Sequence, residues 1–204
     1  MPEFDVSEPE FDVSEVEHPR ADEELGWFSY TCGHCNTRIC GAVVADYFDH
    51  RIKWLLCPKC CGPSVLTVDG DMYPGALGGP NIQGLRAEVD AAYGEARRCM
   101  SVNSFIACEL VCRKILMHAA VDKGAKEGET FADYIDYLEK KGYITPPMEK
   151  WVQLIRQHGN QATHSIEPAD KERAEGTLIF TAQLLRLVYE MEHLSDKYAP
   201  PEGD

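Results

Sequence analysis

Two pairs of cysteines carry the strongest chemical signal in this sequence. The motifs at 32–35 and 57–60 are Cys-x2-Cys knuckles separated by 21 residues. Four thiolates at about 2.3 Å satisfy a tetrahedral Zn²⁺ ion completely, so such a site has no open position for substrate or water. We therefore expect one structural zinc ion, bound by Cys32, Cys35, Cys57 and Cys60. Iron–sulfur binding, redox thiols and accidental spacing are the alternatives, and Cys40 or Cys61 could replace one of the four ligands.

A second concentration of reactive side chains lies at residues 154–164. It brings the guanidinium of Arg156, the amide of Asn160 and the imidazole of His164 to the expected end of a helix. Arginine can brace a phosphate and histidine can move a proton near neutral pH. This combination suits metal-independent RNA cleavage through attack by the 2′-hydroxyl. The structural alternative is that basic residues complement the helix dipole while Gly159 serves as an ordinary cap.

Charge and composition limit the classes of protein. The chain has 204 residues, 44% of them hydrophobic, and a formal net charge of −14, which argues against a protein that holds nucleic acid through general basicity. No run approaches the 18–20 or so apolar residues of a membrane span, and the N-terminus is acidic where a signal peptide is basic. We therefore expect a cytoplasmic protein with no membrane partner. The nine cysteines then favour free thiols and metal binding over disulfides.

The composition changes several times along the chain. Residues 2–8 and 9–15 are an exact tandem repeat, and residues 1–25 hold ten acids and one base, so we expect an acidic disordered tail that could bind a protein partner. A zinc ribbon follows at 26–68, and glycine and proline crowd residues 69–83, which predicts a linker. The remaining predictions are a helical domain over 84–195 and a disordered tail over 196–204.

The ordered elements follow from hydrophobic patterning. Runs of β-forming residues predict strands at 27–31, 41–45 and 64–68. Beyond the linker, helical periodicity predicts helices at about 85–100, 105–119, 131–138 and 146–159, and a long last helix capped by Asp170. The second helix is apolar over much of its circumference and is expected to be central, with Cys108 and Cys112 buried in the core. The expected fold is a small β zinc ribbon followed by an all-α bundle.

Two segments of the helical part carry a family resemblance. The run from Ala107 to His118, together with Ile155-Arg156 and the run from Gly159 to His164, resembles domain of unknown function family 4145, which is similar to the HEPN superfamily. The resemblance covers about residues 84–195 and implies a HEPN-like helical bundle. HEPN domains are known as dimeric, metal-independent ribonucleases of toxins, antiviral defence and RNA processing, alongside inactive relatives that bind or scaffold. By this resemblance Arg156 would stabilise the transition state, His164 would act as general acid or base, and Asn160 would assist.

These observations leave two main functions open. One is a metal-independent endoribonuclease of nucleic-acid-linked defence or RNA metabolism, acting as a homodimer on RNA. The other is a non-catalytic adaptor that binds nucleic acid or protein. Seven residues separate Arg156 from His164, one more than active HEPN nucleases usually have. A third hypothesis is that the protein is an inhibitor whose acidic tail mimics nucleic acid.

Overall fold

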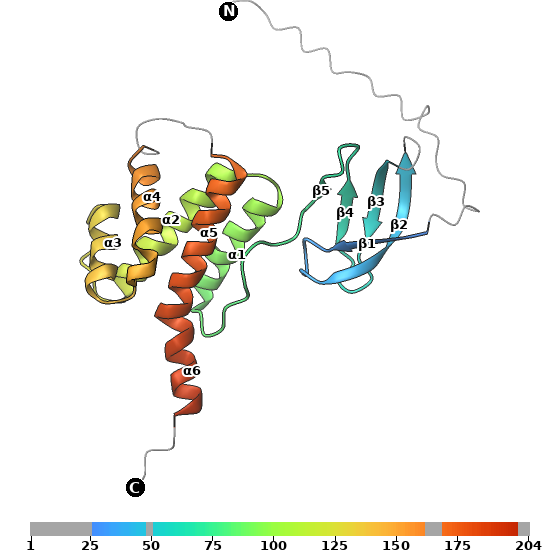
Figure 1. Ribbon diagram of the computed structural model, residues 1–204. Helices are drawn as coiled ribbons and strands as arrows, with labels where there is room; N and C mark the ends of the chain where they lie inside the picture. Colours follow the sequence, from blue (N-terminus) through green and yellow to red (C-terminus); the bar gives the residue numbers. More distant parts are fainter. Residues whose placement is uncertain (1–25, 48–50, 162–168, 200–204) are drawn as a thin grey trace, which may run out of the picture.

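The chain begins with a sheet and continues with helices. The computed structural model describes residues 26–47, 51–161 and 169–199, and for residues 157–161 it describes the helix alone. An antiparallel sheet comes first and a helical region follows it (Figure 1), which confirms the predicted order of the two parts. The tail predicted at 1–25, and the last five residues of the one predicted at 196–204, lie outside the described residues.

The sheet is a five-stranded meander in which each strand pairs antiparallel with the next. Its strands are β1 (Trp27–Thr31), β2 (Arg38–Tyr47), β3 (Ile52–Leu56), β4 (Pro63–Leu66) and β5 (Met72–Tyr73). Strands β1, β2 and β4 fall on the predicted runs, whereas β3 and β5 were not expected. Lys53 interrupts the apolar pattern of β3 and lies 3.8 Å from Asp46 across the β2–β3 pair, which accommodates its charge. β5 has only two residues, too few to show a pattern.

The helical region has six α-helices, with two short irregular turns between them, in the described part of the chain. The elements are α1 (Ala87–Ser101), α2 (Phe105–Asp122), α3 (Phe131–Lys140), the 3-10 turn η2 (Pro146–Met148), α4 (Glu149–Gln161), α5 (Lys171–Leu185), the π turn η3 (Arg186–Glu190) and α6 (Met191–Tyr198). Asp170 caps α5 as predicted, because its side chain accepts a hydrogen bond from the amide of Arg173. None of these helices, within the described residues, combines the length and apolar character that crossing a membrane requires.

Helix α2 lies at the centre of the helical region. It packs against α1, α3 and α5, and its buried side chains form much of one core cluster. Cys108 and Cys112 are fully buried one turn apart on α2, as predicted. A hydrogen bond with Cys112 and burial both raise the pKa of Cys108, so these thiols serve as small core side chains.

The last helix extends beyond the predicted end of the helical domain. α5 passes through η3 into α6 without a break and projects beyond the other helices (Figure 1). It ends at Tyr198, three residues after the predicted boundary at 195. The reason is local: Ala199 adopts an extended backbone conformation before Pro200, and a residue that precedes proline is disfavoured in a helix.

The segment predicted as a linker lies against α1. The guanidinium of Arg97 on α1 donates hydrogen bonds to Gly78 O at 2.7 Å, to Gly79 O at 3.3 Å and to Asn81 Oδ1 at 2.9 Å. Arg97 is only 8% exposed, so these acceptors satisfy a buried charge. Residues 78–81 are therefore part of the packing of the helical region.

Candidate metal centre and helical site

The four predicted ligands meet in space. One ligand atom from each of Cys32, Cys35, Cys57 and Cys60 lies within 4.8 Å of the others, so the cluster could hold a metal ion. The Sγ atoms of Cys32 and Cys60 are 3.7 Å apart, and those of Cys35 and Cys57 are 3.8 Å apart. A tetrahedron of sulfurs at about 2.3 Å from a central Zn²⁺ ion has edges of about 3.8 Å. The donor set and the spacing therefore fit zinc.

The two knuckles are built in the same way. In the first, between β1 and β2, the amide of Asn36 donates to Cys32 O at 2.8 Å, and in the second, between β3 and β4, the amide of Cys61 donates to Cys57 O at 2.8 Å. Asn36 and Cys61 both have positive φ, at 52° and 57°. These equivalent turns direct the cysteine side chains of the two hairpins toward one point.

The thiols differ in how readily they lose their protons. Hydrogen bonds from the side chain and the backbone of Thr37 lower the pKa of Cys35 to about 6. The pKa of Cys60 is raised to about 12: a backbone hydrogen bond from Gly62 lowers it, but burial and the neighbouring thiols outweigh that effect. Four thiolates at this spacing repel one another, and a cation at the centre would relieve that repulsion.

The remaining polar residues near the cluster have other roles. His34 Nε2 lies 2.8 Å from Pro63 O, which joins the first knuckle to the start of β4. Cys40 Sγ lies 3.8 Å from Ser29 Oγ, and Cys61 is exposed. Neither Cys40 nor Cys61 belongs to the four-sulfur cluster found among the described residues.

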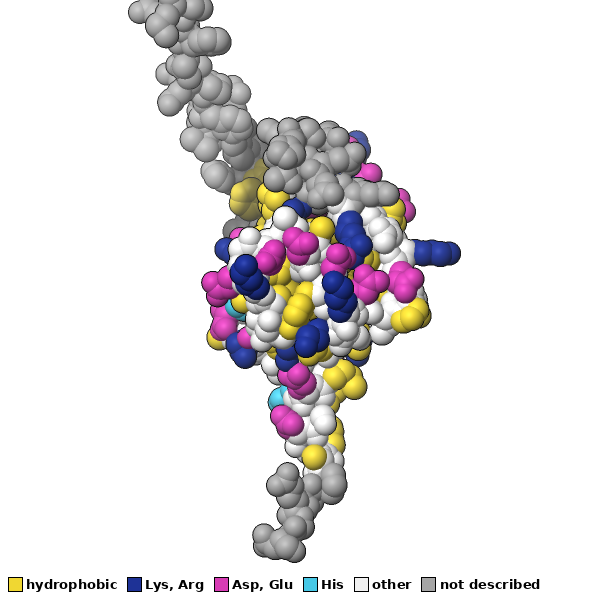
Figure 2. Space-filling model, turned by 90° about the vertical axis from the view of Figure 1, so that its left-hand side faces the viewer, with side chains coloured by type: hydrophobic (Ala, Val, Ile, Leu, Met, Phe, Trp, Pro, Cys, Tyr) yellow, Lys and Arg dark blue, Asp and Glu magenta, His cyan; other side chains and the backbone are white. Residues whose placement is uncertain are grey.

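Arg156 lies on α4 and turns toward α3. Its guanidinium forms an ion pair with Asp136 and donates a second hydrogen bond to Glu139 at 3.1 Å. Across the face seen in Figure 2, basic and acidic side chains are interspersed and do not gather into one basic patch. The side chain of Asn160 and all of His164 lie outside the described residues, so the predicted trio remains a prediction.

Sequence reasoning missed the two partners of Arg156. Asp136 and Glu139 lie three residues apart on α3, a spacing that places both carboxylates on one side of a helix. That spacing was the available signal, but which helix would face it depends on tertiary packing.

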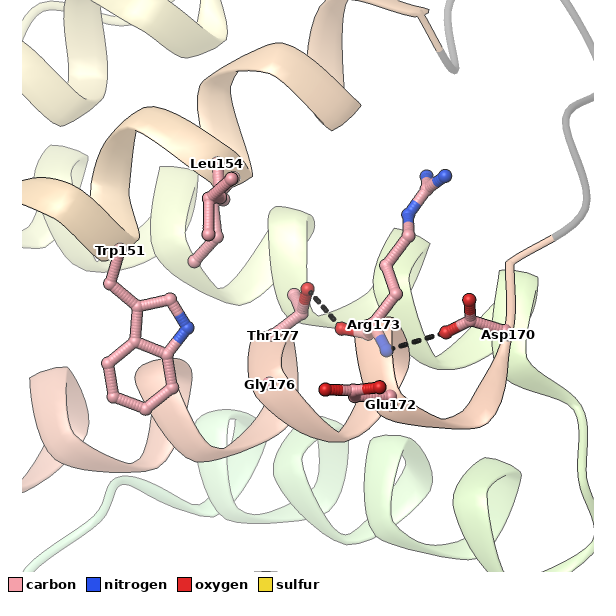
Figure 3. A pocket seen from close by; sticks show the side chains of 8 residues that line it. Trp151, Leu154, Asp170, Glu172, Arg173, Gly176 and Thr177 are labelled. Carbon is pink, nitrogen blue, oxygen red and sulfur yellow. Dashed lines mark hydrogen bonds between the residues drawn. The ribbon is translucent and has the colours of Figure 1, made fainter.

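A pocket of about 440 Å³ lies between α4 and the start of α5 (Figure 3). It is lined by Trp151, Leu154, Ile155, Asp170, Glu172, Arg173, Gly176 and Thr177. Several of its polar groups already have partners: Asp170 caps α5, Thr177 Oγ1 donates to Arg173 O, and the guanidinium of Arg173 makes two hydrogen bonds to Glu109, at 2.7 and 2.8 Å. Arg156 is not among the residues that line this pocket, so the pocket and the predicted catalytic arginine are separate features.

Comparison with known proteins identifies the helical part. The family model described as Domain of unknown function (DUF4145) matches residues 94–199. The chain belongs to this family. A search of curated proteins and a search of solved structures each found no match.

The DUF4145 match begins within α1, so the metal centre lies outside it. The sheet that carries the centre has one apolar face turned to solvent. Trp27 is 68% exposed and Trp54 is 54% exposed. The strand register places both on the same face, because Trp27 pairs with Ala42 and Ala42 pairs with Leu56, two residues from Trp54 on β3.

The opposite face of the sheet is its core. Tyr30, Val43 and Leu55 are buried there together with Cys32 and Cys57. Val44, at the irregularity between Val43 and Ala45, is 47% exposed, and Leu56 is 38% exposed. The four-cysteine cluster thus lies on the core side of a sheet whose outer face presents two indoles with aliphatic neighbours. Both the cluster and this face lie outside the DUF4145 match.

Proposed function

We propose that this protein is a zinc-dependent adaptor in which the ribbon binds single-stranded RNA and a HEPN-like DUF4145 domain links it to nucleic-acid-linked defence or RNA metabolism. The observation that carries the proposal is the pair of exposed indoles, Trp27 and Trp54, on one face of the sheet. Two strand spacings, about 10 Å, separate β1 from β3. Unstacked bases bind to exposed aromatic rings of this kind, at about 1–3 kcal/mol per base.

The ribbon repels a polyanion less than the rest of the chain does. Residues 26–68 hold four Lys and Arg residues and two Asp residues, whereas the chain as a whole carries −14. A zinc ion held by four thiolates contributes about −2, so the loaded ribbon is close to neutral. Binding would therefore depend mainly on stacking, with a shallow dependence on salt.

Zinc fits the four-cysteine cluster and its sulfur spacing, and a four-thiolate site leaves no position for catalysis at the metal. When bound, the ion supplies structural cross-linking of the two knuckles. Cys32 and Cys57, both fully buried, would anchor it beneath the sheet, while the less buried Cys35 and Cys60 complete the site. The role of the chain is then to hold the outer face of the sheet in one conformation.

The test is a fluorescence titration of the full-length, zinc-loaded protein with oligouridylate and oligoadenylate at low salt. We expect quenching of tryptophan emission in the wild type. We also expect a Kd at least tenfold weaker for the double variant Trp27→Ala, Trp54→Ala, measured by the fluorescence anisotropy of the same oligonucleotides carrying a dye at the 5′ end, because this variant retains no tryptophan in the ribbon. Trp151→Phe is the matched control, because Trp151 packs edge-on against Phe180 in the helical region, with the ring centroids 5.7 Å apart, and should leave the Kd unchanged. No binding by the wild type, or equal binding by the double variant, would contradict the proposal.

Metal-independent cleavage of RNA is the competing function. It requires Arg156 to reach a phosphate, but the guanidinium of Arg156 is engaged by Asp136 and Glu139, which favours the adaptor. Incubation of labelled RNA with the protein in excess EDTA decides between them. The adaptor predicts no cutting, whereas cutting by the wild type and not by folded His164→Ala would establish the ribonuclease. The predicted homodimer is tested on the same samples by light scattering.

A further inference from the structure

The first knuckle touches the segment that follows the sheet. Gly33, between the ligands Cys32 and Cys35, packs directly against the backbone of Pro74 and Gly75. A Cβ atom added at position 33 would meet Pro74 O at 2.5 Å and Pro74 C at 2.8 Å, and it would also collide with Gly75 O. The contact joins backbone to backbone, so only glycine fits it.

Asn36 adds a hydrogen bond at the other end of the same knuckle. Its Oδ1 accepts from the amide of Leu77 at 3.1 Å. The turn that places this side chain is the one closed by the bond from the Asn36 amide to Cys32 O, with Asn36 at a φ of 52°. Asparagine tolerates this left-handed conformation better than most residues. The position of the amide oxygen therefore depends on the fold of the knuckle.

The contacted segment is in turn fixed to the helical region. The amide of Gly75 donates to Ser101 O at the end of α1, at 2.7 Å. Asn103, in the turn before α2, donates from Nδ2 to the hydroxyl of Tyr73 at 2.8 Å. Farther along, Tyr93 donates to Pro80 O at 3.0 Å. Residues 73–80 thus contact the first knuckle on one side and form hydrogen bonds with α1 and the α1–α2 turn on the other.

We infer that the metal centre also acts as a clamp between the two parts of the protein. Zinc holds the first knuckle in the conformation that seats Gly33 on Gly75 and Asn36 on Leu77, and these contacts dock the ribbon on the helical domain. Loss of the metal releases the knuckle, because small metal sites of this kind fold together with their ion. The inference rests on the zinc centre of the proposed function and does not require RNA binding.

The two knuckles provide matched variants that separate docking from metal binding. Asn36→Gly keeps a residue that tolerates positive φ and removes the bond to Leu77. Cys61→Gly makes the same backbone change at the equivalent position of the second knuckle, where the side chain is exposed and outside the ligand set. Gly33→Ala and Pro58→Ala form a second pair, since Pro58 is the exposed counterpart of Gly33.

The experiment is hydrogen–deuterium exchange of the full-length protein, read for peptides that cover residues 74–78, with metal content measured on the same samples. We expect exchange at these residues to rise about five-fold in Asn36→Gly, the effect of one net hydrogen bond, and more in Gly33→Ala. One zinc per chain should remain bound in both variants. Cys61→Gly and Pro58→Ala should match the wild type, and chelation of the wild type should raise exchange at 74–78 at least as much as Asn36→Gly does.

Failure of the clamp and failure of the zinc centre give different results. If the wild type holds one zinc per chain and neither chelation nor Asn36→Gly changes exchange at 74–78, the clamp is wrong and the zinc centre stands. If the purified wild type binds no zinc when supplied with one equivalent, the zinc centre itself is wrong and the clamp falls with it.

Discussion

At the scale of single residues, removal of one buried ligand should abolish metal binding. Cys32 is fully buried in the cluster, and serine in its place offers a poor zinc ligand and leaves a polar group in the core. We expect Cys32→Ser to lower zinc content from one per chain to near zero, measured by elemental analysis after gel filtration. Cys40→Ser, which changes a thiol outside the cluster, should keep one zinc per chain. Loss of zinc from Cys40→Ser would show that the ligand set is different.

The two candidate sites differ in how far their residues could be predicted from the sequence. The four clustered cysteines could be predicted from their spacing, because each knuckle is a local turn and zinc accepts only a narrow set of ligands. The partners of Arg156 could not be predicted, because Asp136 and Glu139 belong to another helix. Local chemistry can be inferred from neighbours along the chain, whereas the partner of a long side chain depends on packing between helices.

Arg156 should contribute to stability through its two carboxylates. In Arg156→Met, Asp136 and Glu139 are left one turn apart without their cation, and we expect a loss of about 1 kcal/mol in urea unfolding, limited by the exposure of both acids. Asp136→Asn combined with Glu139→Gln removes the repulsion, so Arg156→Met in that background should cost much less. An equal cost in both backgrounds would mean that Arg156 stabilises the fold by other contacts.

At the scale of elements, helices were easier to predict than strands. Helices α1 to α5 repeat their apolar positions over at least ten residues each, so the pattern is sampled several times. β3 has five residues interrupted by Lys53, and β5 exists only because Met72 and Tyr73 pair with β4. The pairing of β2 with β3 shifts its register between Val43 and Ala45, and no sequence pattern indicates that shift.

The N-cap of α5 was predicted from the sequence, and its contribution to the free energy of unfolding can be measured. Asp170 accepts from the Arg173 amide at 2.8 Å, so Asp170→Ala leaves that amide without its partner. We expect a loss of about 1 kcal/mol in the free energy of unfolding. Asp170→Asn should retain most of the stability, because asparagine caps nearly as well. Full stability of Asp170→Ala in urea denaturation would argue that the amide finds another acceptor.

At the scale of the whole molecule, the boundary of the helical domain follows from Arg97. The predicted boundary at residue 84 would separate this buried guanidinium from Gly78, Gly79 and Asn81, its three hydrogen-bond acceptors. In the fragment 84–199 water replaces these three acceptors, and each intramolecular hydrogen bond lost in this way costs about 1 kcal/mol net. We therefore expect the fragment 84–199 to be less stable than the fragment 76–199 by about 3 kcal/mol in urea unfolding. Arg97→Met removes the charge that needs those acceptors, so it should narrow the difference between the fragments. If the two wild-type fragments unfold at the same urea concentration, residues 76–83 contribute nothing to the helical domain, and the Gly/Pro-rich segment is a linker as its composition first indicated.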